Sequence, residues 1–140
     1  MQINRYHPDG EQPSSGEPWI WVFGSNLAGR HGAGAALVAT ANFGAVRGVG
    51  EGRTGQSYAI PTKDHSLAVL PLQAIRVSIA AFLEYARENP DLQFFLTRVG
   101  CGLAGYQDKV IAPLFAEAPP NCSLPKNWAP FIQPIPGSNR

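Results

Sequence analysis

The stretch PWIWVFGSNLAGRHGAGAA, residues 18–36, decides the fold. Its apolar beginning predicts a strand over Trp19–Gly24, and the glycine-rich residues 24–34 follow directly. A helix is expected over His31–Phe43, where apolar residues recur at helical spacing. A strand, a loop of small residues and a helix in this order predict one repeat of an α/β domain.

The rest of the chain continues this alternation. Further strands are predicted over Gln56–Thr62, Leu92–Val99 and Asn121–Leu124. One helix is expected to begin at Pro71 and to end before Pro90, because a proline ring cannot continue a helix. Another is expected over Gln107–Ala118, where Pro113 must lie early or bend it. The pattern predicts an α/β sandwich with a largely parallel sheet over residues 18–125, between an irregular arm (1–17) and a proline-rich tail (126–140).

Two glycine loops, residues 24–34 and 100–105, each follow a predicted strand and lead into a predicted helix. Ligands of open α/β sheets bind at the carboxyl ends of strands, so we expect both loops to meet at one crevice. Helix starts offer unpaired N–H groups and a positive dipole end, which together suit a pyrophosphate. Arg30, Arg47, Arg53, Lys63 and Arg98 would add positive charge near this rim. The alternative is that the glycines only form tight turns and caps.

Composition argues against several other classes of function. The 140 residues are 44% hydrophobic and 15% charged with a net charge of +1, which gives no strong signal for nucleic acid. No apolar run approaches the roughly 18 residues that suggest a membrane span. Cys101 and Cys122 lack metal-ligand spacing, and the chain has no Walker motif. We therefore expect a reduced, cytoplasmic protein without a metal or cofactor.

Three strings in order resemble the macro domain superfamily: SNLAGRHGAGAALVATANFG (25–44), SYAIPTK (57–63) and RVGCGLAGYQDKVIAPLF (98–115). Within that superfamily they are most similar to the branch that contains the terminal ADP-ribose protein glycohydrolase, and to short uncharacterised bacterial and phage proteins. The resemblance implies a three-layer α/β/α fold that binds ADP-ribose. It also implies that the partner is an ADP-ribose-like small molecule or an ADP-ribosylated macromolecule.

The resemblance assigns roles to individual residues. Asn26 would hydrogen-bond the distal ribose, residues 32–35 would line the pocket, and residues 100–106 would wrap the diphosphate with backbone amides. Lys63 matches the lysine that this branch is thought to use against the anomeric carbon, and burial near arginines would favour its neutral amine. The ligand-binding residues expected in this way are Ser25, Asn26, His31, Gly32, Ala33, Gly34, Ala35, Gly100, Cys101, Gly102, Leu103, Ala104, Gly105 and Tyr106.

Several of these residues also have simpler interpretations. Lys63 could be a solvated lysine after a strand, and His31 could cap the helix as readily as contact phosphate. Cys101 lies at a helix start, which can activate a thiol, but small buried cysteines are common there. Tyr106 could stack on a ribose or base, although packing in the core is the more frequent role.

The chain also departs from the family pattern. Ala104 stands where the branch has its catalytic acid, so Asp108, Asp64 or Glu51 would have to replace it. The aspartate that usually holds adenine has no evident counterpart. Three functions therefore stay open: hydrolysis of an ADP-ribosyl linkage with Lys63 and Asp108 as catalytic residues, binding without chemistry, and protein interaction by a domain without a pocket. A Gly34→Val substitution is expected to block the pocket without unfolding the protein.

Overall fold

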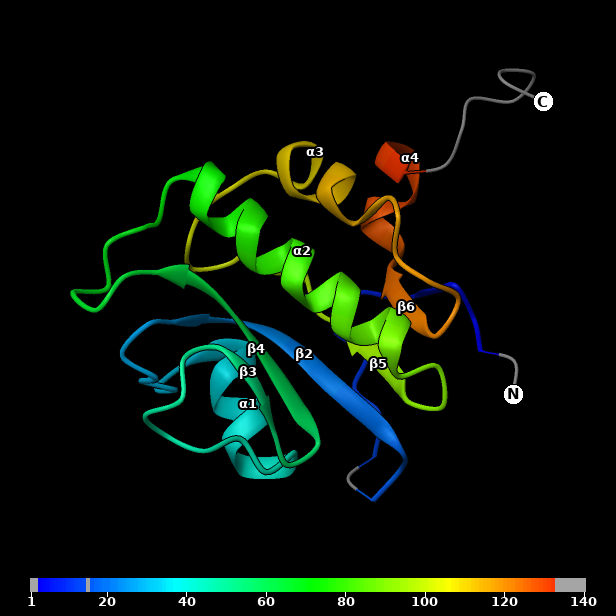
Figure 1. Cartoon of the computed structure of the whole chain (residues 1–140), viewed down its shortest axis with the longest axis horizontal. Helices are drawn as coiled ribbons and strands as arrows, with labels where there is room; N and C mark the ends of the chain where they lie inside the picture. Colours follow the sequence, from blue (N-terminus) through cyan, green and yellow to red (C-terminus); the bar gives the residue numbers. More distant parts are fainter. Residues whose placement is uncertain (1–2, 15, 133–140) are drawn as a thin grey trace.

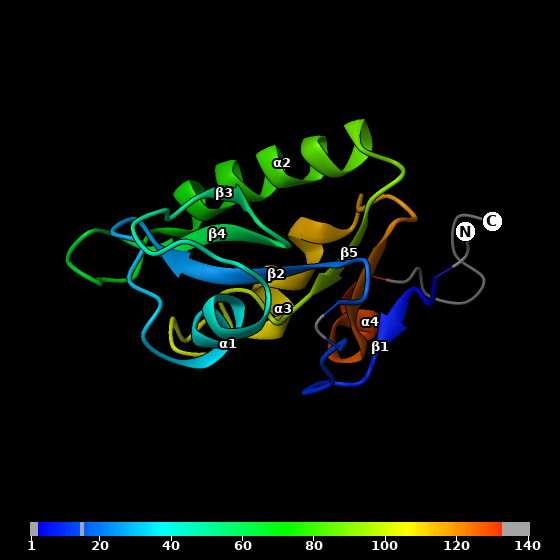
Figure 2. The same ribbon diagram turned by 90° about the horizontal axis from the view of Figure 1, so that it is seen from below.

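The computed structural model describes residues 3–14 and 16–132 and shows helices on both faces of a mixed, six-stranded sheet (Figures 1 and 2). The strands are β1 (Tyr6–His7), β2 (Trp19–Asn26), β3 (Gly52–Thr54), β4 (Ser57–Lys63), β5 (Gln93–Leu96) and β6 (Cys122–Pro125). The helices are α1 (Gly34–Asn42), α2 (Leu72–Glu88), α3 (Asp108–Ile111) and α4 (Ala129–Ile132), with 3₁₀ turns η1 (Ala112–Phe115) and η2 (Lys126–Trp128). The sheet order is β1-β6-β5-β2-β4-β3, and only β3 runs antiparallel to its neighbour. The predicted α/β class and three-layer arrangement are confirmed.

Strand β2 builds both halves of the core because alternate side chains of a strand point to opposite faces. Ile20 and Val22 face one cluster of buried side chains, and Trp21 and Phe23 face the other. All four side chains are at most 4% exposed. The apolar run that predicted a strand is therefore continuous because the strand is covered on both sides.

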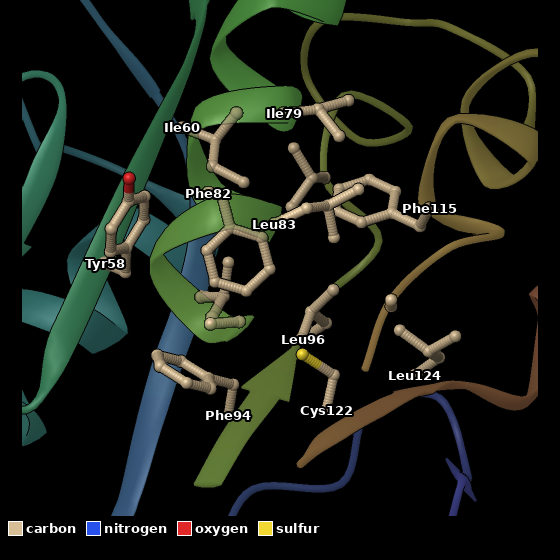
Figure 3. Packing of buried hydrophobic residues seen from close by; sticks show 14 of the residues in the cluster. Tyr58, Ile60, Ile79, Phe82, Leu83, Phe94, Leu96, Phe115, Cys122 and Leu124 are labelled. Atoms are coloured by element: carbon tan, nitrogen blue, oxygen red, sulfur yellow. The ribbon is translucent and has the colours of Figure 1, made fainter. Parts of the chain in front are cut away.

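Helix α2 covers the first face together with α3 and η1. Its buried residues recur at helical spacing and pack on β4, β5 and β6 in the interior shown in Figure 3. Pro71 is the residue before its first turn, and the helix ends at Glu88, ahead of Pro90. The helix predicted over this segment is confirmed.

Helix α1 covers the second face through small residues that allow close approach to the aromatic rings of the sheet. Ala36 and Ala39 are buried, and Phe43 stacks on Trp21 with ring centroids 5.1 Å apart. The Trp21 indole N–H donates a 3.0 Å hydrogen bond to the carbonyl of Ala35. This bond joins the first turn of α1 to the body of β2.

Several boundaries differ from the predicted ones. Helix α1 begins at Gly34 rather than His31, so the glycine loop before it is longer than expected. The helix expected over 107–118 is divided into α3 and η1, because Pro113 has no N–H for the next α-helical hydrogen bond. Strand β3 lies in the glycine-rich segment 44–55, where no strand was predicted.

The segments on either side of the expected domain also take part in the sheet and core. Tyr6 and His7, in the arm expected to be irregular, form β1 beside β6. Trp128, in the segment expected to be a tail, is fully buried and stacks on Phe115. Residues 133–140 of that tail lie outside the described part of the chain. Among the described residues, no helix combines the length and apolar composition needed to cross a membrane.

Candidate functional site

A cavity of about 640 Å³ lies at the carboxyl ends of β2, β4 and β5. The loops after β2 and after β5 reach the same edge of the sheet (Figure 1) and both line this cavity. The expected convergence of the two glycine loops on one crevice is therefore confirmed. The lining residues are Asp9, Gly24, Ser25, Asn26, Arg30, Gly32, Ala33, Gly34, Ala35, Ala36, Thr62, Lys63, Leu67, Thr97, Arg98, Gly100, Cys101, Gly102, Leu103 and Ala104.

The sheet order gives the cavity two chemically different ends. Lys63 stands at the end of β4, and Asp9 follows β1 on the opposite side of the sheet. The loops after β2 and β5 lie between these ends. An amine at one end, a carboxylate at the other and glycine-rich backbone between them match an elongated ligand with an anionic middle.

The loops in the middle of the cavity contain backbone N–H groups that are available as hydrogen-bond donors. Within the described part of the chain, residues 32–36 and 102–104 donate no backbone hydrogen bond. Helix α1 has no side chain that caps its first turn, and Ala33 at its N-cap has extended backbone geometry. Free amides at the start of α1 and in the loop after β5 can therefore receive anionic oxygens from both sides.

The cations around the cavity fall into two groups. Arg98 donates to the Asp108 carboxylate through Nε at 3.0 Å and Nη2 at 2.7 Å, and its Nη1 lies 3.4 Å from Asp9. Arg30 and Lys63 line the cavity and form no ion pair with any described residue. Arg98 is therefore held by the protein, whereas Arg30 and Lys63 can interact with a ligand.

Ser25 and Asn26 line the cavity, yet their side chains are used within the protein. The Ser25 hydroxyl donates to the carbonyl of Gly50. The Asn26 amide nitrogen donates to the carbonyl of Arg30 at 2.8 Å, and its oxygen accepts from the Arg30 N–H at 2.9 Å. In this structure Asn26 shapes the loop that presents Arg30.

Asp108 lies outside the cavity lining and has a structural environment. It accepts hydrogen bonds from Arg98 and from the Trp128 indole N–H at 2.9 Å. Burial acts to raise its pKa, but the hydrogen bonds from Arg98 and Trp128 outweigh it and hold the pKa of the carboxyl below its ordinary value. Asp108 is thus ionised and engaged, which is unfavourable for a general acid.

The other acids considered as replacements for the acid expected at Ala104 also lie elsewhere. Asp64 accepts hydrogen bonds from the backbone of Ser66 and Ala68, and Glu51 is exposed. Neither lines the cavity. Asp9 is the carboxylate that does so among the described residues, and it lies at the end opposite Lys63.

Cys101 lines the cavity as a half-buried thiol. Burial raises the pKa of this thiol to about 12, and the Asp108 carboxylate nearby adds to the effect. A thiol with so high a pKa is almost fully protonated at neutral pH. The environment therefore opposes a nucleophilic role for Cys101.

His31, Gly105 and Tyr106 were expected at the ligand but lie outside the cavity lining. His31 is 2% exposed and packs edge-on against Phe23, and neither ring nitrogen has a partner among the described residues. The Tyr106 hydroxyl donates to the carbonyl of Leu70 at 2.7 Å, and its ring packs against the main core. Tyr106 therefore joins the β5–α3 loop to the segment before α2.

The sequence interpretation missed five lining residues: Asp9, Ala36, Thr62, Leu67 and Thr97. Thr62 ends one predicted strand and Thr97 lies near the end of another, so their position at the same sheet edge was available as a signal. Asp9 had no such signal, because a two-residue strand shows no periodicity. Comparison with protein-family models, curated proteins and solved structures finds no match to this chain.

Proposed function

We propose that the cavity binds ADP-ribose or a related nucleoside diphosphate ribose. The observation that supports this most is the pair of loops that line one cavity between Lys63 and Asp9 and whose backbone amides at residues 32–36 and 102–104 donate no hydrogen bond to a described residue. Amides of this kind bind phosphate oxygens without requiring a metal or a dense cationic patch. The resemblance of the same loops to macro domains independently suggests the same ligand.

The size and ends of the cavity agree with this ligand class. A volume of about 640 Å³ lies within the range of small-molecule sites. The Asp9 carboxylate can accept a hydrogen bond from an exocyclic amine, such as that of adenine. Lys63 can donate to hydroxyl groups at the other end, where the Thr62 hydroxyl is already donated to the carbonyl of Ser25 at 3.2 Å. The cavity thus offers complementary groups to a base, a diphosphate and a second sugar in sequence.

Calorimetry with ADP-ribose tests the proposal directly. We expect saturable binding at one site per chain and a rise in melting temperature with ligand concentration. An Arg30→Gln variant should bind more weakly, whereas Arg47→Gln should not, since Arg47 is exposed and outside the cavity. Absence of heat and of any thermal shift at millimolar ADP-ribose would remove the proposal.

Hydrolysis of an ADP-ribosyl linkage is a second candidate function, favoured by the position of Lys63. Its side chain is half-buried, lines the cavity and lacks an acidic partner among the described residues. In that reaction the Lys63 nitrogen would form a bond to the anomeric carbon while the bond to the leaving group breaks, and a proton lost from the nitrogen would go to the leaving group. Water would then release the ribose and regenerate the amine.

A matched pair of lysine variants separates hydrolysis from binding alone. We expect Lys63→Ala to abolish turnover of an ADP-ribosylated substrate, and Lys109→Ala, which changes an exposed lysine outside the cavity, to retain it. Full turnover by Lys63→Ala would exclude the lysine from the reaction. Binding of ADP-ribose by the wild type without turnover of any substrate would leave the site a binding module.

A further inference from the structure

We propose that Leu67 is a specificity-determining residue that packs on a second uncharged sugar or nucleoside unit of the ligand, beyond the diphosphate. The inference rests on the proposed function and deepens it. It would make the preferred ligand a diphosphate that joins two such units, rather than one that ends at its phosphates. Three observations carry it: the backbone conformation of Leu67, its exposure within the cavity, and its place beside Lys63.

Leu67 has an unfavourable backbone conformation. Its φ angle is +67°, and it is the one residue other than glycine with a positive φ in the described part of the chain. A left-handed conformation costs an L-residue with a Cβ atom roughly 1–2 kcal/mol. Glycine would adopt it freely, and asparagine would do so more readily than leucine. Leucine at this position therefore makes the protein less stable than glycine would.

The surrounding turn holds this conformation firmly. The Asp64 carboxylate accepts hydrogen bonds from the N–H groups of Ser66 at 2.8 Å and Ala68 at 3.0 Å. The Leu67 N–H donates to the carbonyl of Asp64 at 3.0 Å, and the Asp64 N–H donates to the carbonyl of Ala68 at 2.8 Å. The turn thus fixes where the Leu67 side chain lies.

Packing in the protein interior does not offset this strain, because the Leu67 side chain lies outside the core. It is 42% exposed and belongs to neither cluster of core residues, yet it lines the cavity. Strained residues persist at functional sites where the side chain is needed in one place. An apolar side chain on the wall of a ligand cavity gains stability when a ligand covers it.

The position of Leu67 indicates which part of the ligand it would cover. Lys63 forms a bridge with Val69, so the turn that carries Leu67 leaves and returns beside Lys63. This is the end of the cavity opposite Asp9, beyond the amides of the two glycine loops. An aliphatic side chain offers a ligand neither a hydrogen bond nor a charge, so its contribution is apolar contact area. The carbon face of a sugar or base fits the same place.

The experiment compares two ligands, ADP-ribose and ADP, which differ in the second sugar and end alike at the base. Calorimetric affinities are measured for the wild type, L67G, L67A and the control L37A. Leu37 is a matched control because it is 44% exposed on α1 and outside the cavity lining. L67A keeps the left-handed strain and removes the bulk, so it separates loss of the side chain from the added freedom of glycine.

We expect L67G and L67A to lower the affinity for ADP-ribose about fivefold, because the apolar area of one contact is lost. The affinity for ADP should stay within about twofold of the wild-type value. L37A should change neither affinity, and L67G should melt no lower than the wild type because it relieves the strain. Equal losses for both ligands, no loss for ADP-ribose, or a clear fall in the melting temperature of L67G would each overturn the inference. Failure of the wild type to bind ADP-ribose would instead overturn the proposed function, and this inference with it.

Discussion

The Asn26 carboxamide forms two hydrogen bonds with the backbone of Arg30: it donates to the carbonyl at 2.8 Å and accepts from the N–H at 2.9 Å. Both residues line the cavity, but Arg30 is exposed while Asn26 is 9% exposed. The buried amide therefore holds the loop in the conformation that presents the Arg30 guanidinium, which forms no ion pair with a described residue. Asn26 therefore supports the loop, and Arg30 is the residue of the same loop that is available to a ligand.

This division predicts different effects for the two side chains. Arg30→Gln should weaken ADP-ribose binding roughly three- to tenfold at low salt, with a smaller dependence on salt than the wild type shows, and should leave stability unchanged. Asn26→Ala should lower the free energy of unfolding by about 1–2 kcal/mol and also weaken binding, because two partly buried hydrogen bonds are lost. Calorimetry across a salt series and urea denaturation distinguish the two. Unchanged stability in Asn26→Ala would contradict the supporting role.

Glycine positions in the first loop differ in what they tolerate. A Cβ at Gly32 would meet no atom within 4 Å, and its φ is not positive, so Gly32→Val should fold normally and fill part of the cavity. Gly34 also has open space but a φ of +59°, where a β-branched residue costs about 1–2 kcal/mol or more. Gly34→Val, expected to block the pocket without unfolding the protein, should therefore also lower the free energy of unfolding, and Gly32→Val is the cleaner test of the pocket.

The corresponding measurement pairs melting temperature with affinity. Gly32→Val should retain the wild-type melting temperature. It should lower the affinity for ADP-ribose at least roughly tenfold, because the valine side chain would occupy space where the backbone contacts the ligand. Gly34→Val should melt lower even without ligand. Wild-type affinity in Gly32→Val would place the ligand away from this loop.

Long periodic or apolar segments made the sequence informative about the fold. The strand at Trp19, the helix from Leu72 and the buried strand around Phe94 could be predicted because each shows a clear pattern over several residues. Strand β1 could not, because Tyr6 pairs with Leu124 far along the chain and two residues carry no period. Tertiary contact, rather than local preference, forms such a strand.

The candidate site was predicted in outline for a similar reason. Glycine loops after parallel strands converge by topology, so the position of the cavity followed from the order of the elements. The left-handed conformation of Leu67 opposes its residue preference, and the Arg98–Asp108 pair depends on packing around α3. Features that work against local preference or join distant segments leave little trace in a single sequence.

The two cysteines should be unreactive in the folded protein. Burial raises the pKa of both Cys101 and Cys122 to about 12. At pH 8 their thiolate fraction would then be on the order of a thousandfold below that of an unfolded chain, whose thiols have ordinary pKa values near 8.5. Thiol titration with a disulfide reagent should proceed slowly in buffer and rapidly in denaturant. Fast modification of one thiol in buffer would reopen a nucleophilic role for Cys101.

His7 should make stability depend on pH. Its ring is 7% exposed, stacks on Phe95 at 3.7 Å and contacts Ser123 Oγ and the Leu96 carbonyl at 2.9 Å each. Burial is the main cause that lowers its pKa from 6.5 to about 4. Between these values the unfolded chain binds the proton and the folded protein does not, so stability is full above about pH 6.5 and falls as pH drops toward 4, by on the order of 3 kcal/mol. Urea denaturation across this range should show the free energy of unfolding falling as the pH is lowered in the wild type and in His65→Gln, a control at an exposed histidine. The dependence should be lost in His7→Gln. If it persists in His7→Gln, other groups cause the pH dependence.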